Sequence, residues 1–183
     1  MSAFAEFAAL GEKLEATRAR KVMAALVADY LRILPAHEIA LAARMIIGRV
    51  FPEREGRPLN LSGAAVVRAV NQVVKTTAAQ RQQIASEAVD FGQSVQMMFE
   101  RGIRLQASGL PLALGEVWRA FQNIAAASGS GSRQRKDDIL RMLLQRATPL
   151  EAKYIVKVAV GEMRHGVSEG LLLEGIALAA DVP

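Results

Sequence analysis

The sequence contains no cysteine and only two histidines, and aromatic residues make up 5% of it. The absence of cysteine excludes disulfides, thiolate nucleophiles and cysteine-rich zinc sites together. Neither histidine, His37 or His165, has a second ligand at a metal-binding spacing, so we expect neither to bind a metal. Metal-centred and thiol-based chemistry are therefore not predicted for this chain.

Long apolar runs and nucleotide-binding motifs are also absent. No apolar run reaches the roughly 18 residues of a membrane span, and the N-terminus lacks the charged region of a signal peptide. Gly129 and Gly131 lack the preceding strand and the third glycine of a dinucleotide turn. Lys136, Asp137 and Asp138 are adjacent on a predicted helix, which favours a solvated polar face over a metal site. We expect a soluble, cytoplasmic protein without a membrane partner and without catalytic residues.

Apolar residues, mostly Ala, Leu, Val and Ile, account for 51% of the 183 positions, enough to bury a sizeable core. They recur at helical spacing with little strand-like alternation. The predicted fold class is therefore all-α, a compact multi-helix domain. The net charge of +5 favours a polyanionic partner.

Capping residues divide the chain into helices. Thr17, Ser62, Thr77, Ser132 and Thr148 are the predicted N-caps, and Thr148 is followed by proline and then by Glu151 at the third helical position, as in a capping box. The predicted helices cover roughly residues 2–16, 18–34, 38–48, 63–75, 78–90, 93–101, 117–125, 133–147, 149–161 and 168–180. The last is apolar on most sides, so we expect it to be buried. The polar segment 53–60 is either functional or a surface excursion.

Basic residues gather at two predicted helix starts. The flexible turn Gly129-Ser130-Gly131 precedes Ser132 and a first turn that carries Arg133, Arg135 and Lys136. Cations at a helix N-terminus oppose the helix dipole, so their presence there indicates an anionic ligand, for which phosphate is the natural candidate. Arg18, Arg20 and Lys21 occupy the same place at the second helix.

The two ends of the chain resemble one another. Arg18, Arg20 and Lys21 match Arg133, Arg135 and Lys136 at an offset of 115, whereas Glu38 matches Glu151 and Gly48 matches Gly161 at an offset of 113, which implies a two-residue deletion. We predict two pseudo-symmetric halves, 1–104 and 112–183, joined by a connector at 105–111. Two such halves would present two phosphate-binding edges, a shape suited to the two strands of a duplex.

The pattern as a whole resembles the N-terminal DNA-binding domain of ATP-dependent DNA ligases. The resemblance rests on Gly129 to Ser132 with Lys136 four residues on, on Glu151-Ala-Lys-Tyr-Ile, and on Gly161-Glu-Met-Arg-His-Gly166 before the apolar closing helix. Upstream, Phe51-Pro52 and Leu59-Asn-Leu-Ser-Gly63 agree with it. The family's Gly-Asp-x-Gly motif appears here as Val89-Asp90-Phe91-Gly92.

The resemblance implies an all-α domain, monomeric, that grips double-stranded or nicked DNA through the minor groove. Separate nucleotidyltransferase and OB-fold domains of the same ligase would do the chemistry, with ATP and Mg as their cofactors and none in this domain. The positions implied to contact DNA are Arg20, Lys21, Arg49, Gly129, Ser130, Gly131, Ser132, Arg133, Lys136, Arg164 and Gly166. The cellular setting implied is the cytoplasm, associated with the nucleoid if the source is bacterial.

None of the six lysines is followed by the Lys-x-Asp-Gly pattern that ligases adenylate, so we expect no sealing chemistry from these residues. The alternative interpretation is a helical scaffold that binds another protein, with the stripe Val66, Val70 and Val74 partly exposed. Salt-dependent binding to duplex DNA distinguishes the two.

Overall fold

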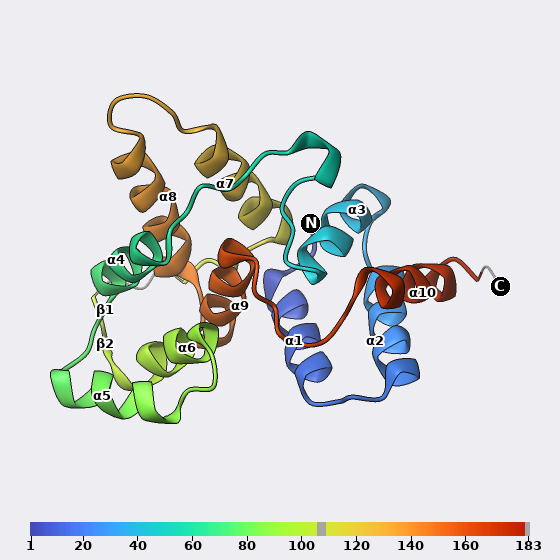
Figure 1. The fold of residues 1–183 in the computed structure, drawn as a ribbon, viewed down its shortest axis with the longest axis horizontal. Coiled ribbons are helices and arrows are strands. Elements are labelled where there is room, and N and C mark those ends of the chain that lie inside the picture. Colours follow the sequence, from blue (N-terminus) through green and yellow to red (C-terminus); the bar gives the residue numbers. More distant parts are fainter. Residues whose placement is uncertain (106–108, 182–183) are drawn as a thin grey trace.

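The computed structural model describes residues 1–105 and 109–181, and the fold within that part is all-α, as predicted (Figure 1). The first six helices are α1 (Phe4–Glu15), α2 (Arg20–Arg32), α3 (Ala36–Ile46), α4 (Gly63–Val73), α5 (Ala78–Glu87) and α6 (Phe91–Arg101). The last four are α7 (Leu114–Ala126), α8 (Ser132–Arg146), α9 (Pro149–Val160) and α10 (Glu169–Ala179). A short 3-10 helix, η1 (Glu53–Glu55), and the antiparallel pair β1 (Val74–Lys75) and β2 (Ile103–Arg104) complete the described elements.

Local capping explains several helix starts. Thr148 Oγ1 accepts a hydrogen bond from the Glu151 backbone N at 3.2 Å, while a Glu151 carboxylate oxygen accepts from the Thr148 backbone N at 2.8 Å. Thr77 forms the same reciprocal capping box, and Ser62 caps α4 through the Ala65 backbone N. Ser168 caps α10 in the same way. Each satisfies backbone donors that the first helical turn leaves unpaired.

Other predicted boundaries are wrong. The N-cap of α2 is Ala19 rather than Thr17, whose hydroxyl instead accepts a hydrogen bond from the Ala19 backbone N. The helix predicted to reach Lys75 ends at Val73, because Val74 and Lys75 pair with β2. The helix predicted over 93–101 begins earlier, at Phe91, because the Asp90 side chain caps it through the Gln93 backbone N.

The helix α9 lies at the centre of the molecule, where it packs against α6 and α1, while α4 packs on α8 and α10 packs on α2 (Figure 1). One continuous apolar core joins these elements and contains Phe4, Phe7, Phe121 and Tyr154 at 1% exposure or less. Residues from both predicted halves contribute to it. Part of the connector, residues 106–108, lies outside the described residues.

The helix α10 is not buried as predicted. Only Leu171, Leu172 and Gly175 are buried, whereas Leu173 is 64% and Leu178 46% exposed. The reason is that α10 packs mainly on α2, so apolar side chains on its other sides face solvent. No helix in the described part of the chain combines the length and apolarity that a membrane crossing needs.

A buried ionic network joins α1, α6 and α9. Lys157 Nζ contacts Glu15 Oε1 at 2.5 Å and Asp90 Oδ2 at 2.7 Å, and Lys153 Nζ contacts Glu15 Oε2 at 2.7 Å. Both lysines are at most 4% exposed. Burial alone would raise the pKa of Glu15 and Asp90. Hydrogen bonds outweigh it and lower both pKa values, from Lys153 and Lys157 to Glu15 and from Lys157 and the Gln93 backbone N to Asp90. Gly92 leaves room for the Lys157 stem, whose Cγ would lie 2.7 Å from an added Cβ.

Candidate nucleic-acid interface

The turn before α8 is held by its own arginine. Gly129 and Gly131 both take left-handed backbone conformations, with φ of 72° and 74°. Arg135 folds back from α8 and donates hydrogen bonds to the carbonyl oxygens of Ser130 at 3.2 Å and Ser128 at 2.6 Å. The turn is therefore exposed but fixed in shape, and Arg135 stabilises it instead of pointing away.

The residue that caps α8 is Gly131, not Ser132 as predicted. The left-handed Gly131 directs the chain straight into the helix, so Ser132 already has helical backbone and its hydroxyl caps nothing. Arg133 is exposed, and no partner of its side chain is found among the described residues. Lys136 Nζ donates to the Asn60 carbonyl oxygen at 3.3 Å.

The starts of α4 and α8 meet in a hollow of about 430 Å³. Its lining includes Ser62, Arg68, Arg133, Lys136 and Asp137. Arg68 forms a two-bond ion pair with Asp137, at 2.9 and 3.1 Å, so Asp137 is buried and not on the solvated face that its position predicted. Two helix N-termini with cations beside them form an environment that favours an anion.

In the turn after α9 (161–168), buried and exposed residues alternate from Met163 to Gly166. Met163 and His165 are buried, whereas Arg164 and Gly166 are exposed, with φ of 55° and 81°. Lys157 Nζ donates to the Met163 carbonyl oxygen at 3.1 Å, and His165 Nδ1 accepts a hydrogen bond from the backbone N two residues on at 3.2 Å. Burial lowers the pKa of His165 to about 4, so its ring is neutral at pH 7.

Two further predicted arginines are paired with carboxylates. Arg20, at the start of α2, donates through Nε to both carboxylate oxygens of Glu174, at 3.2 and 3.0 Å. Arg49 Nη1 contacts Glu53 at 3.2 Å and also contacts Glu169. Lys21 is exposed, with no ionic partner in the described residues.

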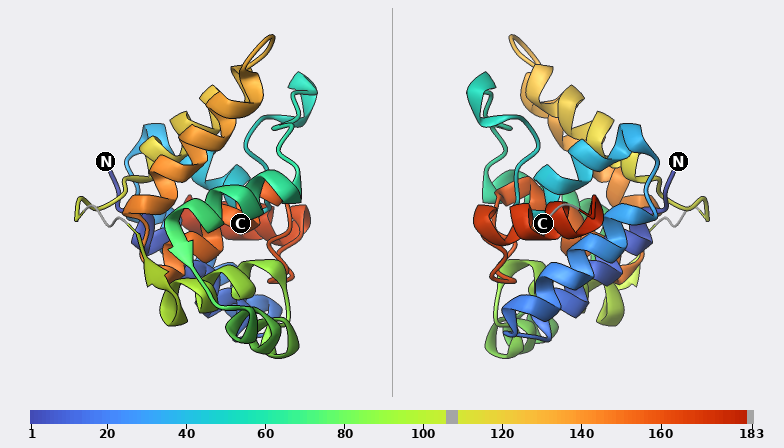
Figure 2. Two further views of the ribbon diagram at one scale, coloured as in Figure 1. Left: turned by 90° about the vertical axis from the view of Figure 1, so that its left-hand side faces the viewer. Right: turned by 90° about the vertical axis from the view of Figure 1, so that its right-hand side faces the viewer.

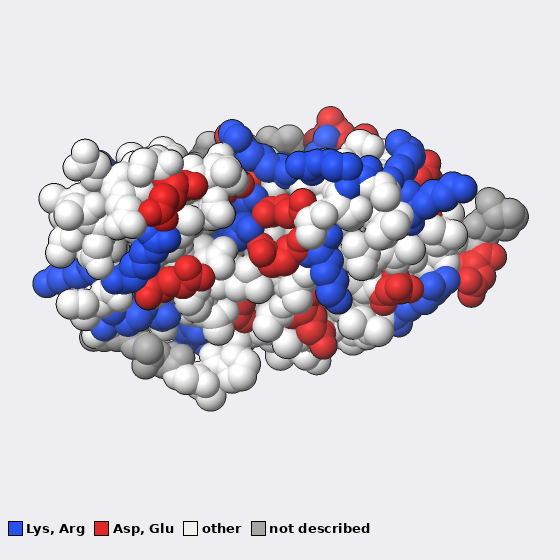
Figure 3. Space-filling model, turned by 90° about the horizontal axis from the view of Figure 1, so that it is seen from below, with Lys and Arg blue, Asp and Glu red and all other residues white. Residues whose placement is uncertain are grey.

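These segments share one side of the molecule, which we call the front face because it faces the viewer in Figure 1. We define it by the turns 127–131 and 161–168, the segment 49–62 and the start of α2. Figure 2 shows them along one margin, on the right of its left panel and on the left of its right panel, with the N-terminus on the opposite side. Figure 3, a view from below, shows Lys and Arg along the middle and right of the upper edge, where the front face lies, with some Asp and Glu among them. The segments that carry most of the predicted residues thus lie on one side of the molecule.

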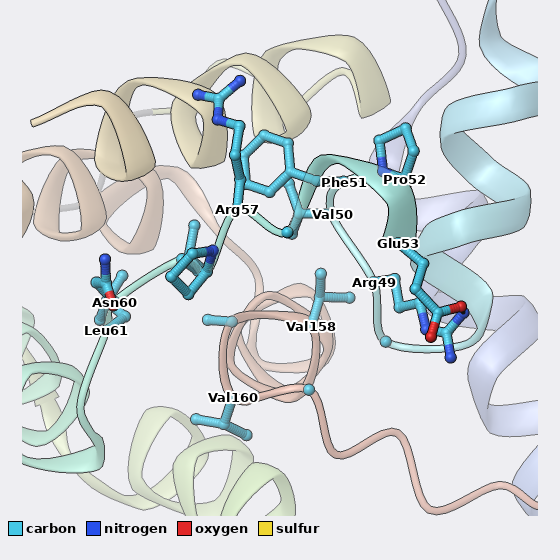
Figure 4. A pocket seen from close by; sticks show the side chains of 16 residues that line it. Arg49, Val50, Phe51, Pro52, Glu53, Arg57, Asn60, Leu61, Val158 and Val160 are labelled. Atoms are coloured by element: carbon cyan, nitrogen blue, oxygen red, sulfur yellow. The ribbon is translucent and has the colours of Figure 1, made fainter.

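A second hollow, of about 520 Å³, lies in the front face between segment 48–61 and the end of α9 (Figure 4). Val158 and Val160 form part of its floor. The Arg57 guanidinium lies over the Phe51 ring at 4.6 Å, which fixes the outer part of the segment. The segment is therefore a structured part of the front face.

Sequence reasoning missed Asn60 and Arg68. Both reach the hollow at the start of α8 only because α4 packs on α8, a contact between residues about 70 positions apart that no local pattern encodes. Arg68, which is the one charged residue of α4, was the available signal. Within the described residues, no three of His, Asp or Glu are gathered in a way that could hold a metal ion.

Comparison with known proteins agrees with this geometry. Residues 3–177 match the family model described as DNA ligase N terminus. The chain is 31% identical over 179 residues to a DNA ligase of Thermococcus onnurineus and 30% identical to one of Thermococcus fumicolans, covering 98% of this chain and 32% of each relative. It is 32% identical over 176 residues to DNA ligase 1 of Korarchaeum cryptofilum, covering 95% of this chain and 31% of the relative. The chain spans about a third of the length of these curated relatives.

Proposed function

Since the chain belongs to the DNA ligase N-terminus family, we propose that it binds duplex DNA, independently of sequence, for an ATP-dependent DNA ligase that acts in repair and replication. The observation that carries the proposal is the gathering of the 127–131 and 161–168 turns and the start of α2 on one side of the molecule (Figure 2). The exposed cations Arg20, Lys21 and Arg164 belong to these segments, and Arg133 lies just after the first of them. If either turn had been buried or had lain on the opposite side of the molecule, one DNA duplex could not contact both turns.

The chemistry proposed for this face is phosphate binding. The starts of α4, α8 and α10 offer the first-turn backbone N–H groups that their caps do not pair, and Lys21, Arg133 and Lys136 add positive charge near these helix starts. Contacts of this kind position a protein on the backbone and carry no direct sequence information. Two such groups of contacts fit the two strands that border a minor groove, so we propose minor-groove binding around a nick.

The partners follow from the same proposal. We propose that nucleotidyltransferase and OB-fold domains of the same ligase carry out sealing, with ATP and Mg²⁺ bound there and not by the residues of this chain. On that view this chain is the non-catalytic, monomeric part that holds the DNA, and it acts wherever chromosomal DNA is found, in the cytoplasm of a bacterium or archaeon.

The experiment that tests the proposal compares neutral variants on the front face with one outside it. Lys21→Gln, Arg133→Gln and Arg164→Gln are expected to weaken binding to duplex DNA, combined more than singly, as measured by fluorescence anisotropy. Arg119→Gln is the matched control, because Arg119 lies beside Met1 on the side away from the front face. Nicked and intact duplexes should bind with similar affinity, because phosphate contacts read the backbone.

Two results would contradict the proposed DNA-binding surface. If the wild-type domain shows no affinity for duplex DNA, or if Arg119→Gln weakens it as much as the three front-face variants do, the surface assigned here is wrong. The predicted alternative, a helical protein-binding scaffold, would then be favoured.

A further inference from the structure

We propose that Glu53, Glu162, Glu169 and Glu174 compete with DNA phosphates for the arginines of the front face and thereby limit how tightly it holds DNA. The proposal rests on the proposed function, because it concerns the affinity of the same surface. Its starting observation is that Arg20, Arg49 and Arg164 each have a carboxylate partner within the chain.

The pair between Arg20 and Glu174 shows the competition most directly. Nε and Nη2 of Arg20 both donate to the Glu174 carboxylate, with Nη2 at 2.5 Å from Oε1. This is the same edge of the guanidinium that would bind a phosphate through two parallel bonds. The hydrogen bond from Arg20 lowers the pKa of Glu174, so the carboxylate is ionised at neutral pH. A phosphate can use this edge only after Glu174 leaves it.

Arg49 and Arg164 are occupied in a similar way. Arg49 Nη1 contacts Glu53 on η1 and Glu169 at the start of α10, so two different segments supply its partners, and Figure 4 shows Arg49 and Glu53 side by side. Arg164 Nη2 contacts Glu162 at 3.2 Å. All of these carboxylates are at least 48% exposed, which leaves them within reach of DNA on the front face.

The front face therefore carries two classes of cation. Lys21 and Arg133 have no carboxylate partner in the described part of the chain and are available for first contact. The three paired arginines must exchange partners. Because exposed ion pairs stabilise a protein very little, the exchange itself is easy. The displaced carboxylates nevertheless stay beside the phosphates and repel them, so both affinity and its salt dependence fall below what the number of arginines would give.

The proposal is tested with Glu169→Gln and Glu174→Gln, which keep shape and remove charge. Each is expected to tighten binding to a short blunt duplex by about twofold to fivefold, and the double variant by about their product. The dependence of log K on log salt should become steeper in Glu174→Gln, because the freed Arg20 guanidinium neutralises a further phosphate. In Glu169→Gln, Arg49 keeps Glu53 as a partner, so the gain there comes mainly from removing a carboxylate that repels phosphate. Thermal unfolding of each variant shows that the fold is retained.

The matched control is Asp29→Asn. The Asp29 carboxylate is also paired with an arginine, Arg32, but it lies toward the opposite end of α2 from Arg20. Asp29→Asn changes the net charge of the protein by the same amount as either glutamate variant does. It is expected to leave affinity and salt dependence nearly unchanged. A second check uses the Arg20→Gln background, where Glu174→Gln should no longer tighten binding because no guanidinium remains to be freed.

Two outcomes overturn the proposal, and they differ. If the wild type binds duplex DNA and the two glutamate variants behave like Asp29→Asn, or if the gain from Glu174→Gln persists without Arg20, the competition proposed here is absent and the proposed function still stands. If the wild type does not bind duplex DNA, the proposed function fails and this proposal fails with it.

Discussion

Gly48 and Gly161, at the borders of two segments of the front face, lie against one another. A Cβ added to Gly48 would come within 3.1 Å of the Gly161 carbonyl oxygen, and one added to Gly161 would come within 3.6 Å of the Gly48 carbonyl oxygen. Both have left-handed backbone conformations, with φ of 73° and 75°. Gly48 follows α3 and Gly161 follows α9, so two turns that occupy corresponding places in the sequence meet in space.

Replacing Gly48 by alanine should destabilise the protein by about 1–3 kcal/mol, because a non-glycine residue is strained at this φ and the new methyl group would press on the Gly161 carbonyl. Urea unfolding measures the change. Gly56→Ala is the control, since Gly56 also has a positive φ, 55°, but has nothing within 4 Å of an added Cβ. Equal losses in the two variants would show that the contact with Gly161 does not matter.

The contacts between helices support the hypothesis of two related halves. The helix α4 packs on α8 as α10 packs on α2, and α3 contacts α7 as α1 contacts α9. The isolated bridge between Ala3 and Ala113 joins the segments that precede α1 and α7. The helices α3 and α9 begin at Ala36 and Pro149, which are 113 positions apart, and α2 and α8 begin at Arg20 and Ser132, which are 112 apart. A single offset near 113 therefore fits both pairs of helices, and the predicted two-residue deletion is not needed. On this offset Arg20 corresponds to Arg133. The symmetry of the halves stays a prediction.

Separate expression of residues 1–104 and 112–183 should give two fragments that do not fold alone. Each would lose contacts that only the other supplies, since α2 and α6 of the first half pack on α10 and α9 of the second. Circular dichroism of each fragment should show no cooperative thermal transition, and mixing the two should restore one. Cooperative unfolding of either fragment by itself would contradict a shared core.

Replacing Lys157 by methionine should destabilise the protein by about 3–5 kcal/mol, because Asp90 and Glu15 would lose a buried charge partner. The matched change at the exposed Lys13, Lys13→Met, should alter the free energy of unfolding by no more than about 0.5 kcal/mol. Adding Asp90→Asn to Lys157→Met should recover part of the loss. Similar losses for Lys157→Met and Lys13→Met in urea unfolding would rule out the network as a source of stability.

The stability of the protein should fall as the pH is lowered from about 6.5 to about 4. In the unfolded chain His165 binds a proton near its ordinary pKa of 6.5, whereas burial lowers its pKa in the folded chain to about 4. The unfolded state therefore binds more protons in this window, and the loss reaches about 3 kcal/mol at its lower end. The lowered pKa values of Glu15 and Asp90 act in the same direction at still lower pH. Urea unfolding of wild type and His165→Gln at a series of pH values should give the steeper dependence only in the wild type.

The sequence predicted best what is decided locally. The capping box of Thr148 and Glu151, the caps Ser62 and Thr77 and the breaks at Gly48 and Gly161 all depend on residues within one turn of each other. The failures are equally specific. Ser132 is not the N-cap of α8, because Gly131, directly before it, has a left-handed backbone conformation and takes that position. The sequence has glycine at both 129 and 131, and it does not tell which of the two precedes the helix.

The remaining differences come from contacts between distant residues. Val74 and Lys75 leave the helix because Ile103 and Arg104 pair with them, and Asp137 is buried because Arg68 approaches from α4. Lys153 on α9 is buried because α1 presents the carboxylates of Glu12 and Glu15 to it, a contact between residues about 140 positions apart. The ion pairs between front-face arginines and carboxylates, such as Arg20 with Glu174, also join residues distant in the sequence and cannot be predicted without the fold.

The measurement that tests the central claim most directly is a salt titration of duplex binding by the wild type and by Lys21→Gln/Arg133→Gln. We expect log K of the wild type to fall linearly with log salt, at about −0.9 per phosphate contacted, alike on duplexes of unrelated sequence. The double variant should show a slope shallower by about 1.8, because two phosphate contacts are removed. Binding that is insensitive to salt, or a slope unchanged in the double variant, would contradict the assignment of the front face as the DNA-binding surface.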